Sequence, residues 1–231
     1  DVVQTDPNSA HVAKAMNALD LLVVQEIFLS ETAKHADVVL PGTTFLEKDG
    51  TFTNTERRVQ RVNRAAKPLP GTKPDGVIVT EMMQKLGSNQ PIYDADEVLA
   101  EIADVVPFFK GITRERLGKM GLQWPVKEDG TDTKILHEKE FKLGKGRIKY
   151  FDWKESSELE KNKKEYPLIL TTSRVLQHYN AATMTKRTKN IKIVDEDVLL
   201  IHPKDAKYRE LNTGDIGRLY SGRGEVSLKV E

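Results

Sequence analysis

The first half of the chain alternates between continuous apolar runs and segments whose apolar residues recur at helical spacing. The two apolar runs, residues 21–28 and 37–42, are typical of buried parallel strands. Helical spacing predicts helices over residues 7–19, 30–36, 73–87 and 94–106. An alternating segment at 57–65 predicts an extended strand. This order of strands and helices indicates an α/β layer over residues 1–110.

The second half of the chain favours β structure. A short helix and a turn are expected within residues 113–126, and the alternating pattern then predicts hairpins and strands at 139–153, 166–174, 197–211 and 214–230, with a short helix ending the third. The hairpin at 214–230 should turn at the sequence SGRG. The charged stretch 154–165 predicts a linker. We therefore expect a connecting segment over 111–165 and a mainly β domain, part of a barrel, over 166–231.

The charge balance and the absence of cysteine narrow the possible functions. The 231 residues contain 36 Lys and Arg against 35 Asp and Glu, so no nucleic-acid partner is expected. Without cysteine, this chain can form no disulfide, thiolate zinc site or cysteine-bound iron–sulfur cluster. No apolar run approaches the roughly 20 residues that span a bilayer, so no membrane insertion by this segment is expected. Because the chain starts at Asp1 and ends within a strand pattern, we expect a fragment or processed piece.

Three candidate ligand-binding residues follow the predicted strands or open a helix. Glu26 lies at the carboxyl end of the first strand, where ligands bind in open α/β sheets, although a solvated acid is the more ordinary occupant. Lys48 lies in the polar loop EKDGTFTN, which would share that edge of the sheet or form a surface turn. Asp75 could cap the helix that it opens. Its carboxylate could instead accept paired hydrogen bonds from the N1–H and 2-amino groups of guanine.

The densest polar cluster is the segment 171–185, TTSRVLQHYNAATMT, which follows a predicted strand. Arg174 suits a phosphate because its guanidinium donates in a fork. His178 could donate to a heterocycle, and a polar loop with a satisfied histidine is the alternative. The five histidines of the chain are scattered without metal-ligand spacing, so we expect no metal held by this chain.

Several longer runs resemble the molybdopterin oxidoreductases, the group that contains formate dehydrogenases and periplasmic nitrate reductase. The run VVQEIFLSETAKHADVVLPGTTFLEKDGTFTNTERRVQRV, residues 23–62, is similar to their third domain, and LTTSRVLQHYNAATMTKR, residues 170–187, to the start of their fourth. Residues 1–9 and 108–126 look most like the formate dehydrogenase alpha subunit. The resemblance covers almost the whole chain. It implies part of a Rossmann-like cofactor-binding domain, followed by a mainly β, double-psi-barrel-like domain.

In this family, loops at the strand ends hold a molybdopterin guanine dinucleotide. The resemblance places Gln25 and Glu26 on the nucleoside-contacting pair, Lys48 on the loop lysine near the cofactor, and Asp75 on the acid that recognises guanine. It places the pterin-side segment on ten consecutive residues: Thr172, Ser173, Arg174, Val175, Leu176, Gln177, His178, Tyr179, Asn180 and Ala181.

The match to the family is incomplete at two positions. The chain has Ser173 where the family usually has Gly, and Asn180 where it often has a second His. The nearby arginines of the first half, Arg57, Arg58 and Arg61, are not matched to ligands. We expect them to hold their loop against neighbouring acids.

The resemblance implies a cofactor-cradling piece of a formate dehydrogenase alpha subunit. The intact enzyme would oxidise formate to carbon dioxide and pass two electrons to other redox subunits or an acceptor, using a bis-molybdopterin guanine dinucleotide cofactor with molybdenum or tungsten. The iron–sulfur cluster and the metal-ligating residues belong to earlier domains of the family, so we expect this chain to be inactive alone.

The alternatives are another molybdopterin oxidoreductase, such as a nitrate reductase, and a cofactor-free scaffold subunit of a respiratory complex. A cytoplasmic location is favoured over an exported one.

Overall fold

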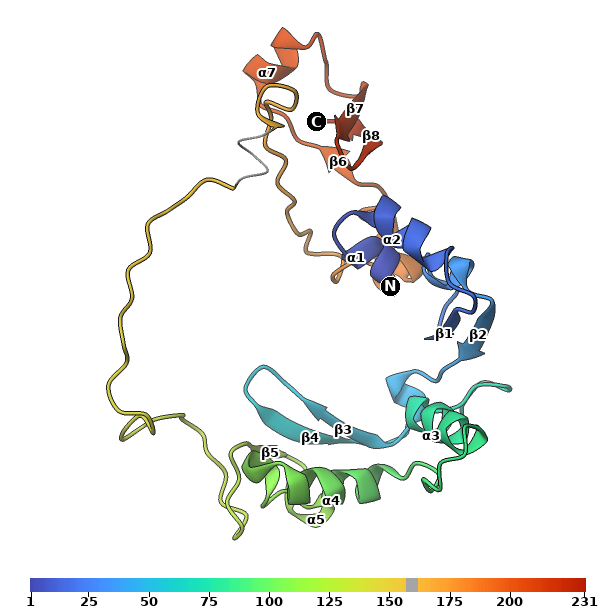
Figure 1. The fold of residues 1–231 in the computed structure, drawn as a ribbon, viewed down its shortest axis with the longest axis vertical. Helices are drawn as coiled ribbons and strands as arrows, with labels where there is room; N and C mark the ends of the chain where they lie inside the picture. Colours follow the sequence, from blue (N-terminus) through green and yellow to red (C-terminus); the bar gives the residue numbers. More distant parts are fainter. Residues whose placement is uncertain (157–161) are drawn as a thin grey trace. The chain divides into compact units, whose positions relative to one another are not determined.

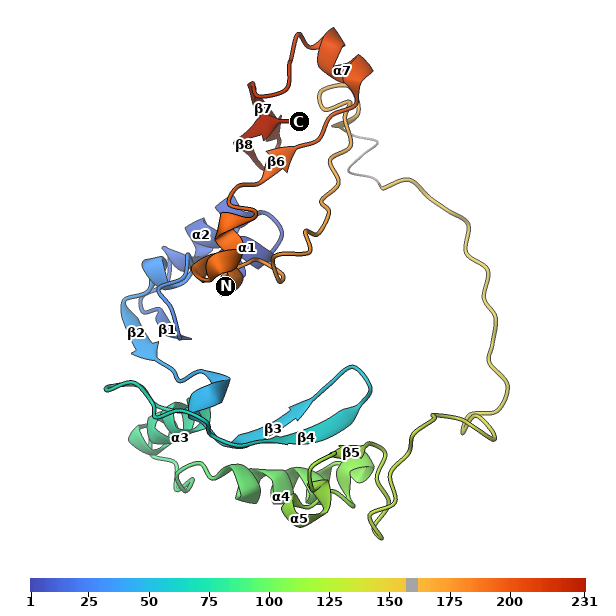
Figure 2. The same ribbon diagram turned by 180° about the vertical axis from the view of Figure 1, so that it is seen from behind.

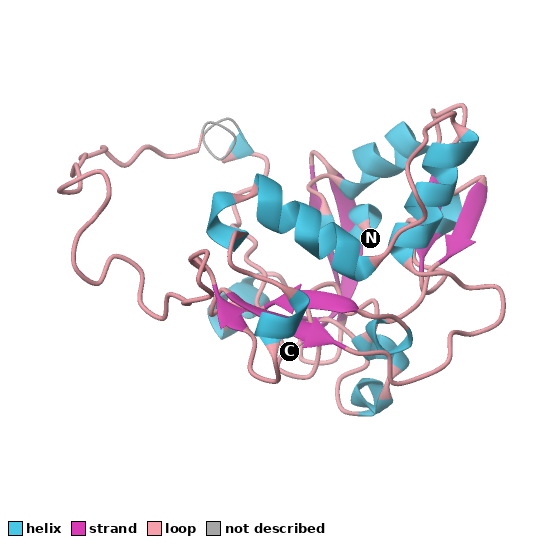
Figure 3. Cartoon of the chain, turned by 90° about the horizontal axis from the view of Figure 1, so that it is seen from below, coloured by secondary structure: helices cyan, strands magenta, loops and turns pink. Residues whose placement is uncertain are grey.

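The computed structural model describes residues 1–156 and 162–231, which divide into two compact units. The first unit comprises residues 1–22, 29–37 and 150–231. The second unit comprises residues 23–28 and 38–149. Short helices and strands are joined by long loops in both units (Figure 3). The domain boundaries that the sequence suggested stay a prediction.

The second unit begins with two parallel strands, β1 (Val23–Glu26) and β2 (Val38–Pro41), in which Val23 lies opposite Val38. Both predicted strands are confirmed, but their predicted burial is wrong. Val38 is 43% exposed, because the sheet formed by the described residues contains only these two strands. A backbone bridge from Gly42, just after β2, leads to the segment that precedes helix α3 (Asp75–Lys85). The sheet edge and the start of α3 are therefore brought together.

The second unit also contains an antiparallel hairpin with three helical segments beside it. The hairpin consists of β3 (Gly50–Thr53) and β4 (Arg58–Val62), and β4 also pairs with β5 (Leu122–Gln123). The polar loop predicted at 47–54 is thus partly a strand. Helix α4 (Ala95–Val105), the turn η3 (Pro107–Phe109) and helix α5 (Arg114–Leu117) lie beside this hairpin (Figure 1).

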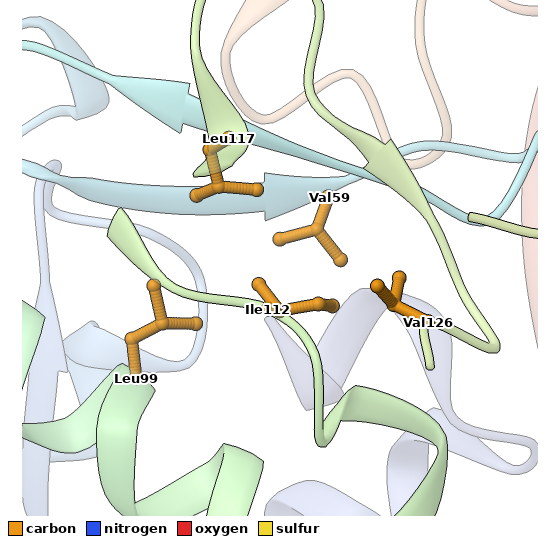
Figure 4. Packing of buried hydrophobic residues seen from close by; sticks show 5 residues of the cluster. All are labelled: Val59, Leu99, Ile112, Leu117 and Val126. Atoms are coloured by element: carbon orange, nitrogen blue, oxygen red, sulfur yellow. The ribbon is translucent and has the colours of Figure 1, made fainter. Parts of the chain in front are cut away.

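The core of the second unit is a small apolar cluster between the hairpin and these helices. Its members are Val59, Leu99, Ile112, Leu117 and Val126, all at most 4% exposed (Figure 4). Helix α4 contributes Leu99 to it, and its predicted start is confirmed because the Asp94 carboxylate accepts from the backbone N–H groups of Asp96 and Glu97. The cluster fixes the hairpin against α4.

The turn of the hairpin is held by Arg57. This residue has a left-handed backbone, with φ of 66°. Its guanidinium donates to the carbonyls of Trp124, Thr133 and Lys134, and it lies 5.6 Å from the centre of the Trp124 ring. The expectation that the arginines pair with neighbouring acids is therefore wrong for Arg57, whose guanidinium donates to carbonyl oxygens. It is confirmed for Arg58, which pairs with Glu56 at 3.2 Å.

The first unit contains three groups of elements. Helix α2 (Ser9–Met16) confirms the helix predicted at 7–19, and a short helix that was not predicted, α1 (Val2–Thr5), precedes it. The helix predicted at 30–36 is a single 3₁₀ turn, η1 (Ala33–His35). Two more 3₁₀ turns, η4 (Thr185–Arg187) and η5 (Lys189–Lys192), follow the polar cluster. The C-terminal group comprises β6 (Val198–Leu199), α7 (Pro203–Tyr208), β7 (Ile216–Ser221) and β8 (Gly224–Val230).

The C-terminal strands form a sheet with the order β6–β8–β7 (Figure 2). Strand β8 pairs with β7 in an antiparallel hairpin and with β6 in parallel. The predicted hairpin is confirmed, since Ser221 lies opposite Gly224 across the SGRG turn. The described residues thus form a mixed three-stranded sheet in this part of the chain, and the general expectation of mixed helix and strand structure holds.

Two predicted β segments are wrong. Residues 139–153 and 166–174 contain no strand and run as extended loops (Figure 1). Ile148 and Trp153, which the alternation would have placed on a sheet, are 100% and 84% exposed. An alternating pattern produces a strand only where a second strand pairs with it. The linker predicted at 154–165 includes residues 157–161, which lie outside the described residues.

No helix of the described residues combines the length and apolar character needed to cross a membrane.

Candidate functional site

Asp75 is the centre of a polar site in the second unit. It is the first residue of α3, and its Oδ1 accepts a hydrogen bond from Gln25 Nε2 at 2.5 Å. Its Oδ2 forms an ion pair with Lys48 Nζ. Residues 25, 48 and 75, predicted from separate parts of the sequence, are therefore brought together by the end of β1, the loop after β2 and the start of α3.

The Asp75 carboxylate does not cap α3. The N-cap position is Pro74, and no side-chain cap bond is formed. Burial alone would raise the pKa of Asp75, but hydrogen bonds from Lys48 and Gln25 and the charge of Lys48 outweigh it and hold that pKa below its ordinary value. The carboxylate is thus kept ionised at the positive end of a helix dipole.

Lys48 is positioned by the buried residue next to it. The Glu47 carboxylate accepts from the N–H and the hydroxyl of Thr44, at 2.8 and 2.9 Å, and from the N–H of Leu69 at 3.0 Å. These bonds lower the pKa of Glu47, chiefly through the Thr44 backbone. They also close a capping box around η2 (Phe45–Glu47). Through Glu47, the loop that carries Lys48 is therefore held to Thr44 and to Leu69.

The polar groups around Asp75 leave capacity for a ligand. A carboxylate offers about four lone-pair positions, and Gln25 and Lys48 use two of them. A side chain at Gly42 would bring its Cβ within 3.3 Å of Asp75 Oδ1, so this glycine keeps that side of the carboxylate open. This set of donors and acceptors fits a nucleotide base with paired N–H donors.

Glu26 is not joined to this group. Its Oε1 accepts from the backbone N–H of the next residue, Ile27, at 2.9 Å. Glu26 is half-buried at the end of β1, close to Gly42, whose N–H donates to the Glu26 carbonyl. The Glu26 side chain thus lies at the predicted sheet edge, but its carboxylate bonds to the neighbouring backbone and not to Gln25, Lys48 or Asp75.

The predicted pterin-side segment belongs to the first unit and is mostly exposed. Residues 172–176 have no regular structure, and Leu176 is 98% exposed. Arg174 Nη1 donates to Asn180 Oδ1 at 2.9 Å. Asn180 has a left-handed backbone, with φ of 49°, which asparagine adopts more readily than most residues. The segment therefore presents exposed donors from a turn that Arg174 and Asn180 hold closed.

Both ring nitrogens of His178 are engaged within the first unit. Its Nε2 lies 2.7 Å from the carbonyl oxygen of Val194, so this nitrogen carries the hydrogen. Its Nδ1 lies 3.0 Å from the Thr185 hydroxyl, which also accepts from the N–H of Tyr179 at 3.3 Å. His178 is therefore a histidine whose hydrogen bonds are satisfied within the protein, which was the alternative interpretation of the sequence. Its two bonds connect the polar segment to η4 and to Val194.

Sequence reasoning missed three residues of the Asp75 site. They are Gly42, the acid Glu47 and an aromatic residue, Tyr93, whose ring packs against Gly76. The pattern of Thr44 followed three residues later by Glu47 is a capping-box signal and could have identified Glu47. Nothing in the local sequence indicates Gly42 or Tyr93. The described residues contain no group of three or more acids and histidines arranged to hold a metal ion.

Two family models match the chain. The model described as molybdopterin oxidoreductase matches residues 1–85, and the model of the molybdopterin dinucleotide binding domain matches residues 168–231. The first match includes Gln25, Glu26, Lys48 and Asp75, and the second includes the whole segment 172–181.

Curated relatives match over nearly the full chain. It is 44% identical to the F420-dependent formate dehydrogenase subunit alpha of Methanocaldococcus jannaschii, over 99% of this chain and 34% of the relative. It is 43% identical to the F420-dependent formate dehydrogenase 2 subunit alpha of Methanococcus maripaludis, over 98% of this chain and 34% of the relative. The chain thus spans about a third of the length of these relatives.

A solved structure with a similar fold is the acetylene hydratase from Pelobacter acetylenicus. Its TM-score is 0.68 at 22% identity, over 97% of this chain and 33% of that one. At this identity the likeness concerns the fold alone. The two family models and the curated relatives show that the chain belongs to the molybdopterin oxidoreductases and matches part of a larger subunit of the formate dehydrogenase alpha type.

Proposed function

We propose that the chain holds the molybdopterin guanine dinucleotide of a formate dehydrogenase alpha subunit. In this proposal the second unit binds the guanine nucleoside through Gln25, Glu26, Lys48 and Asp75. The first unit binds the pterin side through residues 172–181, within what would be part of a double-psi barrel. When bound, the pterin-held metal ion supplies the two-electron chemistry of formate oxidation.

The arrangement around Asp75 carries the proposal. An ionised carboxylate with two free lone-pair positions matches the adjacent N1–H and 2-amino donors of guanine. Cytosine and adenine present an acceptor beside their amino group, so neither can satisfy both positions. Lys48, paired with the same carboxylate, adds a positive charge that suits the diphosphate of a dinucleotide.

The names of the relatives support the rest of the proposal. Their alpha subunits are formate dehydrogenases, so formate is the proposed substrate of the whole protein, and further redox subunits or an electron acceptor are its proposed partners. The retained acid and lysine favour a cofactor-holding protein over a cofactor-free scaffold. Such a scaffold would not need a lysine and an amide held on an ionised aspartate.

The test is the cofactor content of the full-length subunit that contains this chain. Guanine nucleotide released from the purified, denatured protein is measured per mole of protein, together with formate oxidation by a dye acceptor. The parent should release guanine nucleotide. Asp75→Asn removes the charge and one acceptor of the pair, so it should bind roughly ten- to a hundred-fold more weakly and lose most of its nucleotide.

The matched control is Glu81→Gln. Glu81 lies on the same helix and pairs with Lys73 at 2.6 Å, away from the site. This variant should keep its nucleotide. A parent without guanine nucleotide would overturn the proposed function, whereas unchanged retention in Asp75→Asn would overturn the role of Asp75 as the base reader.

A further inference from the structure

A small pocket opens beside Asp75 within the second unit. It has a volume of about 220 Å³ and lies between the start of α3, the β3–β4 hairpin and helix α4. Pockets that hold whole drug-sized ligands range over roughly 300–1,000 Å³. A space of this size therefore suits a single heterocycle and leaves charged groups of the same ligand outside.

The lining of the pocket separates polar from aromatic groups. Lys48, Asp49 and Asp75 supply charge, while Phe45, Phe52 and Tyr93 supply rings. The two phenyl rings lie 6.2 Å apart, and each is about half exposed. An apolar pocket with a few converging polar groups is the usual form of a small-ligand site. Aromatic walls beside a carboxylate specifically suit a flat base with N–H donors.

Tyr93 is fixed as one wall of this pocket. A Cβ added at Gly76 would fall 2.3 Å from the Tyr93 ring, so the ring rests directly on the α3 backbone next to Asp75. The backbone N–H of Tyr93 donates to the Thr80 hydroxyl of α3 at 3.1 Å. Burial and the nearby carboxylates raise the pKa of Tyr93, which keeps its hydroxyl protonated. No described residue hydrogen bonds to this hydroxyl.

We infer that the pocket receives the guanine base, with Tyr93 as a base-contacting residue that the glycine at position 76 makes room for. This inference rests on the proposed function and extends it, because neither the sequence patterns nor the relatives assign Tyr93 a role. The ring stacks on or beside the base while Asp75 accepts from its donors. Phe45 of η2 and Phe52 of β3 cover the base, which shields the hydrogen bonds of Asp75 from water.

The experiment uses the full-length subunit in its cofactor-free form, with GDP and CDP as probes in equilibrium dialysis. Tyr93→Leu removes the ring. Loss of aromatic stacking should weaken GDP binding roughly 5- to 100-fold and reduce the preference for GDP over CDP. Tyr93→Phe keeps the ring and should stay within about tenfold of the parent. Tyr208→Leu, an exposed tyrosine of the first unit, should bind GDP as the parent does.

Glycine 76 provides an independent variant. Gly76→Ala should displace the Tyr93 ring and weaken GDP binding as Tyr93→Leu does. If Gly76→Ala fails to fold, the double variant Gly76→Ala/Tyr93→Ala removes the clash and should fold without regaining GDP affinity. Parent-like GDP affinity and selectivity in Tyr93→Leu would overturn the inference, even where the parent holds guanine nucleotide. A parent that binds neither guanine nucleotide nor GDP would instead overturn the proposed function.

Discussion

At the scale of single residues, Lys48 controls the charge state of Asp75. Burial by itself raises the pKa of this carboxyl, and the bonds from Lys48 and Gln25 reverse that effect. A carboxyl whose pKa is lowered on folding stabilises the protein above its unfolded value, here 3.8, and loses that stabilisation as the pH falls through the folded value. The Asp75 site should therefore persist at neutral pH and fail only in acid.

The lowered pKa of Asp75 predicts how the variant Lys48→Met should respond to acid. Without the hydrogen bond and charge of the lysine, the effect of burial is opposed less strongly, so the pKa of Asp75 should rise and the acid-induced loss of stability should begin at higher pH than in the parent. The measurement is melting temperature as a function of pH in the full-length subunit. Lys73→Met, which removes a lysine paired with Glu81 on the same helix, should leave the acid midpoint in place. An unshifted midpoint in Lys48→Met would contradict the pairing.

At the scale of elements, the β3–β4 hairpin depends on Arg57. Its three carbonyl partners span residues 124–134, so one side chain joins the hairpin turn to the segment that contributes β5 and Val126. Lysine cannot reproduce the fork of a guanidinium. Arg57→Lys should lower the free energy of unfolding by about 1.5–3 kcal/mol, as measured by urea denaturation.

The matched substitution is Arg61→Lys, at an exposed position of β4. It should change the free energy of unfolding by less than about 0.5 kcal/mol. Equal effects of the two substitutions would show that Arg57 is not the tie between hairpin and loop.

Elements with strong local boundaries could be predicted from the sequence. Helices α3 and α4 were predicted from the helical spacing of their apolar residues, and the structure has a local boundary signal at each: Asp94 caps the start of α4, and Gly87 follows the end of α3 with a left-handed backbone, φ of 91°. The alternation at 139–153 was misleading, because a strand also needs a partner. In the candidate site, Lys48 and Asp75 were predicted by resemblance, whereas Tyr93 was not, because Gly76, which its ring contacts, lies seventeen residues earlier in the sequence.

At the scale of the whole molecule, the chain carries one tryptophan in each unit. Trp124 belongs to the second unit, where its ring stacks near Phe109 with centroids 6.2 Å apart and beneath the Arg57 guanidinium. Trp153 belongs to the first unit and is 84% exposed. The sequence contains no other tryptophan.

This placement makes the intrinsic fluorescence of the chain a separate reporter for each unit. A soluble quencher such as acrylamide should suppress the emission of Trp153 strongly and that of Trp124 weakly, because only the first ring is open to collision. Trp153→Phe should leave a blue-shifted, quencher-resistant spectrum that follows the unfolding of the second unit alone. Trp124→Phe should leave a red-shifted, readily quenched spectrum from the first unit, and equal quenching of the two variants would contradict the packing of Trp124.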